Sequence, residues 1–216
     1  MKKNRTGFTL VEIIVVLVIL AILAAIAVPA VLGYVDDAKE ARELAKLRES
    51  LIAAQVTFTK SAAFGENTGS GATSESGSQN YYLSEKQSND IQKYLDEKPY
   101  TLIYGIGDPN KYALGSNETS KVYCIIYQKD SKSKPWYYDG KKWSHRYLWN
   151  KNAVKPGIDA SRAMYSDGTN NRMNGVKDSK GDDAYVATCY VYAYGKPCVS
   201  GENYSGVWNN IKNMSE

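Results

Sequence analysis

The chain has 216 residues, a length that allows one or two domains, and it carries a formal net charge of +4. Three positive charges, Lys2, Lys3 and Arg5, lie within the first seven residues, so the remainder is nearly neutral. Overall charge therefore gives no argument for nucleic-acid binding, and a single histidine without any CxxC pair argues against a metal centre or a catalytic triad.

The first 35 residues differ from the rest of the chain. Behind the basic leader, residues 13–35 form a run of 23 uncharged residues that ends at Asp36 and Asp37. About 20 such residues in a helix cross a hydrocarbon core of about 30 Å. Positive charge in front of the span keeps that end in the cytoplasm. The pattern predicts a single-pass membrane segment followed by an exported C-terminal part.

One carboxylate, that of Glu12, lies at the start of this apolar run. A charged side chain inside a membrane segment costs on the order of 3 kcal/mol on insertion scales, so it usually has a partner and a function. An ordinary secretory signal is shorter and ends at a small-residue cleavage site. A simple membrane anchor explains the length of the run, but it explains neither Glu12 nor the residues before it.

The motif GFTLVE at residues 7–12, with basic residues before it and an apolar stretch after it, resembles the signal of type IV prepilins. The seven-residue leader followed by phenylalanine is similar to the type IVa subgroup and to the related pseudopilins. The resemblance implies that a prepilin peptidase cuts after Gly7 and then methylates the new amine of Phe8. The implied fold is α+β, with one long N-terminal helix packed against an antiparallel sheet and with irregular loops.

The resemblance also implies a division of the chain into four parts. These are the leader (residues 1–7), the membrane-spanning and filament-core half of the helix (8–35), its amphipathic half (36–61), and the exported β-rich head (62–216). Pro29 removes a helix hydrogen bond and clashes with the preceding turn. A kink is therefore expected near Ala25–Pro29, and Gly33 follows it closely.

Cleavage would give Glu12 a partner on another subunit. The new amine of Phe8 is largely protonated at neutral pH, and it would neutralise Glu12 of a neighbouring copy inside an apolar filament core. A buried ion pair adds little net stability because both ions lose their water. An unpaired carboxylate nevertheless penalises a wrong axial register. Phe8 and Glu12 are therefore the candidate assembly residues.

The amphipathic half of the helix carries an apolar stripe at alternating spacings of three and four residues, which is expected to pack on the sheet. The stripe consists of Leu44, Leu47, Leu51, Ala54 and Phe58. Residues 65–79 are rich in glycine, serine and threonine and are expected to form a flexible loop. A capping box at Ser84 and Gln87 predicts a short helix with Ile91 and Leu95 on one face, ending before Pro99.

After Pro99 the pattern favours strands. They are predicted at Tyr100–Ile106, Lys121–Gln128 and Ala184–Tyr194, with a hairpin of Trp136–Tyr138 and Lys141–Arg146 around an Asp139-Gly140 turn. The strand at 184–194 alternates strictly. Its small residues are expected to face the long helix (Ala187, Cys189, Val191 and Ala193), with the tyrosines on the other face. Residues 156–183 are expected to be irregular.

Three cysteines in an exported domain predict one disulfide and one spare thiol. Three single bridges are possible. The resemblance favours Cys189–Cys198, because related proteins with a disulfide commonly close a C-terminal loop with it, and Cys124 is the alternative partner.

Residues 129–155 hold eight lysine and arginine residues and two aspartates, interleaved with aromatic residues. Basic and aromatic side chains together can bind DNA by phosphate contact and base stacking, and aromatic side chains on a hairpin can also stack on a glycan. The candidate contacts are Trp136, Lys141, Lys142, Trp143 and Arg146. A hairpin that covers the core and keeps its lysines in water is the favoured interpretation.

Asp178, Asp182 and Asp183 lie in one loop and offer oxygen ligands of the kind that calcium takes. Some pseudopilins bind calcium in a C-terminal loop. The spacing is not that of an EF-hand, however, so a solvated turn is the favoured interpretation.

The sequence therefore predicts a structural subunit of a type IV pilus, stored in the inner or cytoplasmic membrane and assembled into a helical homopolymer on the cell surface. The resemblance implies, as partners, the prepilin peptidase, the assembly platform and minor pilins. It implies adhesion, twitching motility, aggregation or DNA uptake without choosing among them. The alternatives are a pseudopilin of a type II secretion or competence system and a membrane-anchored monomeric binding module. Neither enzymatic activity nor a cofactor is predicted.

Overall fold

The computed structural model describes residues 9–66, 80–108, 111–113, 116–145, 172–198, 202, 204 and 206–215. The helices in these ranges are α1 (Leu10–Ala63), α2 (Glu85–Lys93) and α3 (Gly206–Ser215). The strands are β1 (Asn80–Tyr82), β2 (Thr101–Gly107), β3 (Val122–Gln128), β4 (Trp136–Tyr138), β5 (Trp143–Ser144), β6 (Arg172–Lys177), β7 (Asp183–Ala193) and β8 (Lys196–Pro197). The chain divides into two units between Ala45 and Lys46, so α1 contributes its first part to one unit and its last part to the other.

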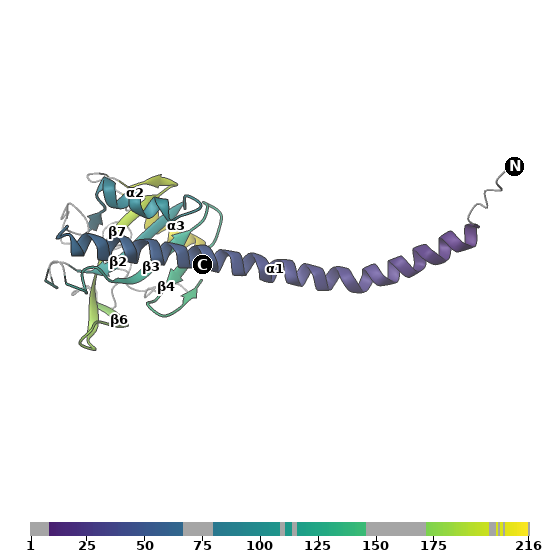
Figure 1. Cartoon of the computed structure of the whole chain (residues 1–216), viewed down its shortest axis with the longest axis horizontal. Coiled ribbons are helices and arrows are strands. Elements are labelled where there is room, and N and C mark those ends of the chain that lie inside the picture. Colours follow the sequence, from purple (N-terminus) through teal and green to yellow (C-terminus); the bar gives the residue numbers. More distant parts are fainter. Residues whose placement is uncertain are drawn as a thin grey trace. The chain divides into compact units, whose positions relative to one another are not determined.

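The first unit contains the apolar part of α1. Its large apolar side chains are exposed, from 77% at Leu10 to 42% at Val35. The mean hydropathy of 3.3 over an 18-residue window makes this helix long and apolar enough to cross a membrane. The helix runs without a break through Pro29, and this part of it is curved (Figure 1). The long N-terminal helix predicted from the sequence is confirmed.

The second unit is built on a largely antiparallel sheet with the strand order β1-β7-β2-β3-β4-β5. β7 lies between β2, which pairs with it antiparallel, and β1, which pairs with it parallel. β6 and β8 also pair with β7, both antiparallel. The predicted strands around residues 100–106, 121–128 and 184–194 correspond to β2, β3 and β7. The α+β architecture expected from the resemblance is thus the observed one.

The last part of α1 packs on one face of this sheet. Leu47, Ala54 and Phe58 of the predicted stripe are fully buried. The Tyr104 hydroxyl donates to the carbonyl oxygen of Ser50 at 2.9 Å, and the Phe58 and Tyr104 rings meet edge to face with centroids 5.8 Å apart. At the centre of the head, the backbone of α1 is therefore in direct contact with a side chain of β2.

The predicted stripe differs from the buried face in its smaller members. Leu44 and Leu51 are only half-buried, whereas Ser50, Thr57 and Ser61 are buried with Ala53. Small side chains bring the helix axis close to the sheet, and a leucine in their place would hold it away. The face of α1 that packs on the sheet is therefore rotated slightly about the helix axis from the face predicted by the spacing of the leucines.

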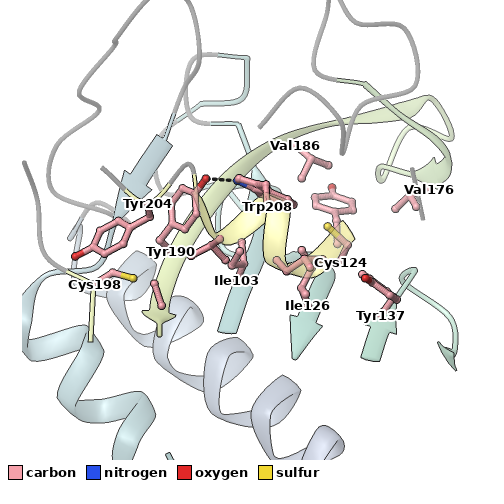
Figure 2. Close-up of a cluster of buried hydrophobic side chains, with 14 of the residues drawn as sticks. Ile103, Cys124, Ile126, Tyr137, Val176, Val186, Tyr190, Cys198, Tyr204 and Trp208 are labelled. Atoms are coloured by element: carbon pink, nitrogen blue, oxygen red, sulfur yellow. Dashed lines mark hydrogen bonds between the residues drawn. The ribbon is translucent and has the colours of Figure 1, made fainter. Parts of the chain in front are cut away.

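The opposite face of the sheet is covered by α3, which the sequence interpretation did not predict. Val207, Trp208 and Ile211 of α3 are buried in a cluster with side chains of β2, β3 and β7. The Trp208 indole N–H donates to the Tyr190 hydroxyl at 2.6 Å, and Figure 2 shows this bond beside Ile103 and Ile126. The sheet is therefore covered by a helix on both faces, which explains why nearly every residue of β2, β3 and β7 is buried.

A β-bulge in β7 overturns part of the predicted alternation. Leu102 of β2 pairs with Tyr192, but the next residue, Ile103, pairs with Tyr190, so β7 has one residue, Val191, without a partner on β2. A bulge shifts every later side chain to the other face. Ala193 consequently joins the cluster under α3, and the prediction that it shares a face with Cys189 is wrong.

The remaining elements agree in part with the sequence. The Ser84–Gln87 capping box is formed, but α2 ends at Lys93, so Leu95 lies beyond it and the predicted Ile91–Leu95 face is wrong.

The hairpin β4–β5 has a four-residue connection, Asp139–Lys142, because Asp139 Oδ1 accepts the amide N–H groups of Lys141 and Lys142. β6 lies inside the segment expected to be irregular. Of the predicted loop 65–79, residues 67–79 are outside the described residues.

The contact between α3 and the sheet predicts a large effect of Trp208→Ala. Truncating a buried tryptophan costs about 3–5 kcal/mol, and here the Tyr190 hydroxyl also loses its donor. We expect the free energy of unfolding, measured in urea by near-ultraviolet circular dichroism of the detergent-solubilised protein, to fall by that amount. Tyr94→Ala, at a side chain that is 50% exposed, is the control and should change it little.

Candidate functional site

The first turn of α1 holds the carboxylate of Glu12 against Thr9. The backbone N–H and the hydroxyl of Thr9 both donate to Glu12 Oε2, each at 2.8 Å. The Glu12 backbone N–H in turn reaches the Thr9 hydroxyl at 3.3 Å. These reciprocal bonds form a capping box, in which the N-cap and N3 residues satisfy each other's exposed groups. Its signature, a threonine three residues before a glutamate, is present in the sequence and would have predicted it.

This capping box gives Glu12 a partner within its own chain. The negative charge also lies at the positive end of the helix dipole, where a carboxylate is favoured. Both bonds fall on Oε2, and Oε1 has no hydrogen bond to any residue that the structure describes. Gly7 and Phe8 are outside the described residues. The approach of a Phe8 amine to Glu12 therefore stays a prediction, with Oε1 as the oxygen open to it.

The three cysteines, Cys124, Cys189 and Cys198, are buried free thiols in the structure. Burial raises the pKa of each, to about 12 for Cys198. Cys124 on β3 pairs with Gly105 of β2, while β7 lies on the other side of β2. Two strand spacings of about 4.8 Å separate Cys124 from β7, which exceeds the Cα separation of about 7 Å that a disulfide spans. Cys198 follows β8, which pairs with Tyr192 on the side of β7 away from β2, so Cys198 lies farther still from Cys124. Neither alternative pairing with Cys124 therefore fits, and Cys189–Cys198 stays a prediction.

The acidic loop between β6 and β7 uses its carboxylates within the protein. Asp178 Oδ1 accepts the backbone N–H groups of Lys180 and Asp182, at 2.9 and 3.0 Å. Asp183 pairs with Lys177 at 2.8 Å. Among the residues that the structure describes, no group of three or more His, Cys, Asp or Glu side chains could hold a metal ion. The geometry is that of a turn closed by Asp178.

A buried carboxylate that the sequence interpretation missed joins two loops beside this turn. Glu118 accepts a hydrogen bond from the Tyr123 hydroxyl and another from the backbone N–H of Ser179 at 2.9 Å. A Cβ atom at Gly107 would lie 2.0 Å from the Glu118 carbonyl oxygen. Only glycine therefore allows this close approach, and the interaction fixes the loop before β3 against the end of β2.

The Tyr112 hydroxyl makes a second link to the same turn. It donates to Asp178 Oδ2 at 3.1 Å and accepts the backbone N–H of Tyr185 at 3.0 Å. Burial, with a contribution from Asp178, raises the pKa of Tyr112 to about 12. The phenol consequently stays protonated and donating at any ordinary pH.

The hairpin β4–β5 brings four aromatic rings to one face. Tyr138 pairs with Trp143 across the strands, with ring centroids 5.2 Å apart, and Trp136 lies over His145 at 3.7 Å. Lys141 and Lys142 are exposed in the turn. The structure thus brings together four of the five candidate contacts, and the fifth, Arg146, lies outside the described residues.

Comparison with known proteins identifies one motif, at the N-terminus of the chain. Residues 2–28 match the model of the prokaryotic N-terminal methylation motif. No curated protein matches the chain, and no solved structure does.

The matched motif is the class III signal peptide of type IV pilins and pseudopilins. The motif indicates a type IV pilin-like or pseudopilin protein, and it implies processing by a prepilin peptidase. The exposed apolar helix and the motif fit anchoring in a membrane before assembly.

The capping box predicts a specific effect of Thr9→Val. The variant keeps the size of the side chain but removes the hydroxyl that both donates to and accepts from Glu12, which should destabilise the first turn of α1 by about 1 kcal/mol. Amide hydrogen exchange at Glu12 and Ile13, whose N–H groups bond Thr9, should become faster by the corresponding factor in detergent micelles. Thr9→Ser should restore the slow exchange, and equal rates in all three proteins would contradict the capping box.

The strand order predicts that Cys124 takes part in no disulfide. Peptide mapping of the oxidised protein under non-reducing conditions should find Cys124 as a free thiol that is alkylated only after unfolding, because it is fully buried. Any bridge observed should join Cys189 to Cys198. A bridge to Cys124 would contradict the register of β2, β3 and β7.

Proposed function

We propose that the protein is a structural subunit of a type IV pilus, cleaved after Gly7, methylated at Phe8 and assembled from the membrane into a surface filament. The observation that carries the proposal is the methylation motif running directly into an exposed apolar helix. Adhesion, twitching motility, aggregation and DNA uptake are all compatible with such a filament.

The exposed surface of α1 supports assembly with other copies. Burying an aliphatic side chain contributes about 1.5–3 kcal/mol, and the helix exposes large apolar residues almost continuously from Leu10 to Val35. Lipid covers such a surface in the membrane. Outside the membrane, only equivalent helices offer a matching all-apolar surface, so the same residues that anchor the precursor also form the core of a filament.

The Thr9–Glu12 arrangement supports a role for Glu12 in register. The carboxylate already has two hydrogen bonds in its own chain, so part of the cost of burying it is met before assembly. The Phe8 amine of a neighbouring subunit would donate a hydrogen bond to Oε1 and so neutralise the Glu12 carboxylate. A subunit in the wrong axial position would leave that oxygen and the amine apart within an apolar core.

A pseudopilin of a type II secretion or competence system is the second candidate, because the same motif serves both classes. The feature expected to favour it was a calcium loop at Asp178, Asp182 and Asp183. The bonds of Asp178 within its own turn and the pairing of Asp183 with Lys177 give this feature no support.

A monomeric anchored binding module is the third candidate, and it would keep the leader. Mass spectrometry of material sheared from cells separates it from the other two. Recovery of an N-methylated peptide beginning at Phe8 from abundant filaments would support the pilus subunit, whereas mature protein that retains residues 1–7 would overturn it. Methylated Phe8 in protein that never leaves the cell envelope would favour the pseudopilin.

Glu12→Val tests the assembly role of the carboxylate. We expect normal amounts of the variant in the membrane, because the substitution makes the span more apolar, but at least a ten-fold loss of sheared filaments. Glu40→Val, on the exposed part of the same helix, is the matched control and should leave filaments in normal number. Filaments of normal amount and length from Glu12→Val would contradict the proposed register mechanism.

A further inference from the structure

The edge hairpin β4–β5 presents a continuous aromatic surface. The rings of Trp136, Tyr138, Trp143 and His145 lie on one face of the hairpin. Tyr137, between Trp136 and Tyr138, points to the other face and into the cluster under α3. Trp136, Tyr138 and Trp143 are half-buried and His145 is exposed. The two cross-strand pairs are two residues apart along β4, which corresponds to about 7 Å. The rings thus form two successive pairs that are each partly exposed to solvent.

Hydrogen bonds fix this surface in place. The His145 ring donates from Nδ1 to the carbonyl oxygen of Pro135 at 2.9 Å, which holds the imidazole over Trp136. Asp139 closes the turn through the amide N–H groups of Lys141 and Lys142. The rings are therefore preorganised, so a ligand that stacks on them loses little conformational entropy of the protein.

Positive charge lies at both ends of the aromatic surface. Lys141 and Lys142 are exposed in the turn, and Lys132 and Lys134 are exposed in the segment that leads into β4. The one carboxylate within the hairpin, that of Asp139, accepts from the turn amides. The surface consequently combines stacking rings with lysines whose charge attracts an anionic ligand.

We propose that the face of the β4–β5 hairpin formed by Trp136, Tyr138, Trp143 and His145, with Lys141 and Lys142, binds single-stranded nucleic acid. Bases stack on the two ring pairs, and the lysine ammonium groups contact the phosphates. Stacking on aromatic side chains together with a basic path for the backbone is the common mode of single-strand binding without sequence preference.

The charge of the surface favours nucleic acid over a neutral glycan. Sugar recognition adds hydrogen bonds to hydroxyl groups from carboxylates or amides placed beside the ring. In this hairpin the available carboxylate is engaged in the turn, and the groups that point outward are ammonium ions. Duplex DNA also fits less well, because its bases are already stacked on one another and only its phosphates remain for the lysines.

This inference does not depend on the proposed function, because the hairpin belongs to the second unit and contains none of the residues assigned to processing or assembly. A pilus subunit, a pseudopilin or an anchored monomer would each present it. A wild-type protein that forms filaments but binds no nucleic acid would overturn this inference alone, and a wild-type protein that binds nucleic acid but forms no filaments would overturn the pilus proposal alone.

The test is binding of a fluorescein-labelled oligothymidine of about 12 nucleotides to the full chain in uncharged detergent, followed by anisotropy over a range of salt concentrations. Trp143→Ala should weaken binding about ten-fold or more, because one stacking step is lost. Trp143→Phe retains a ring and should recover most of the affinity. The double variant Lys141→Gln and Lys142→Gln should reduce the slope of log K against log salt by about 1.4.

Matched controls keep the test specific. Tyr94→Ala and Lys98→Ala remove an exposed ring and an exposed lysine elsewhere on the head and should leave both affinity and salt slope unchanged. The near-ultraviolet circular dichroism of each variant verifies that it is folded. Quenching of tryptophan fluorescence by the oligonucleotide, absent with polyphosphate, would identify stacking directly.

Three results would overturn the inference. The first is no binding to the wild-type protein at low salt. The second is loss of affinity in the lysine variant with none in Trp143→Ala and equal competition by polyphosphate, which would reveal a polyanion patch without stacking. The third is tighter binding of an acidic polysaccharide such as polygalacturonate, which would assign the surface to glycans.

Discussion

The head depends on the close contact between the last part of α1 and the central strand β2. Ser50, Ala53 and Ala54 leave room for the sheet to approach the helix, and Tyr104 uses that room to bond a helix carbonyl oxygen. The donor therefore comes from the middle of β2, not from an edge of the sheet. Because β2 pairs with both β3 and β7, the position of α1 fixes the position of all three strands.

The two parts of α1 have different surroundings. Toward its N-terminus the side chains are apolar on every side and exposed, and the single carboxylate is tied to Thr9. Past Lys46, some polar side chains pair with the rest of the head: Lys46 itself bonds Glu97 at 2.5 Å, and Gln55 bonds the backbone of Ser120 and Val122. Folding of the head thus fixes only the second part, and the first part is stabilised by whatever surrounds it.

The sequence predicted those features whose signal is local. The N-terminal motif, the long helix, the Ser84–Gln87 cap and the strands β2, β3 and β7 each have a pattern within a few adjacent residues. α3 was missed because Val207, Trp208 and Ile211 give only a short apolar pattern, and it becomes meaningful only when the sheet offers Tyr190 and Ile126 as partners. The bulge at Val191 is set by pairing with β2, which no pattern within β7 records.

The candidate sites also divide into those with a local sequence signal and those that depend on distant segments of the chain. Glu12 was found because its charge conflicts with its neighbours, and its partner Thr9 was overlooked although the spacing was visible. The buried carboxylate of Glu118 has no such local contrast, since it lies among polar loop residues and is bound by Tyr123 and Ser179 from two other segments. The face shared by the hairpin rings was partly foreseeable from alternation, but their stacking in pairs required the register of β4 and β5.

The contact between Gly107 and the Glu118 carbonyl oxygen has a consequence for exchanging parts of this head with those of other proteins. The loop 116–120 lies directly on a strand position that has no side chain. A grafted loop of the same length would retain its path only if position 107 remained glycine, and a donor strand with any other residue there would displace the loop. The end of β2 and the loop 116–120 should therefore be exchanged together, with the junctions of a chimaeric protein placed outside residues 107–118.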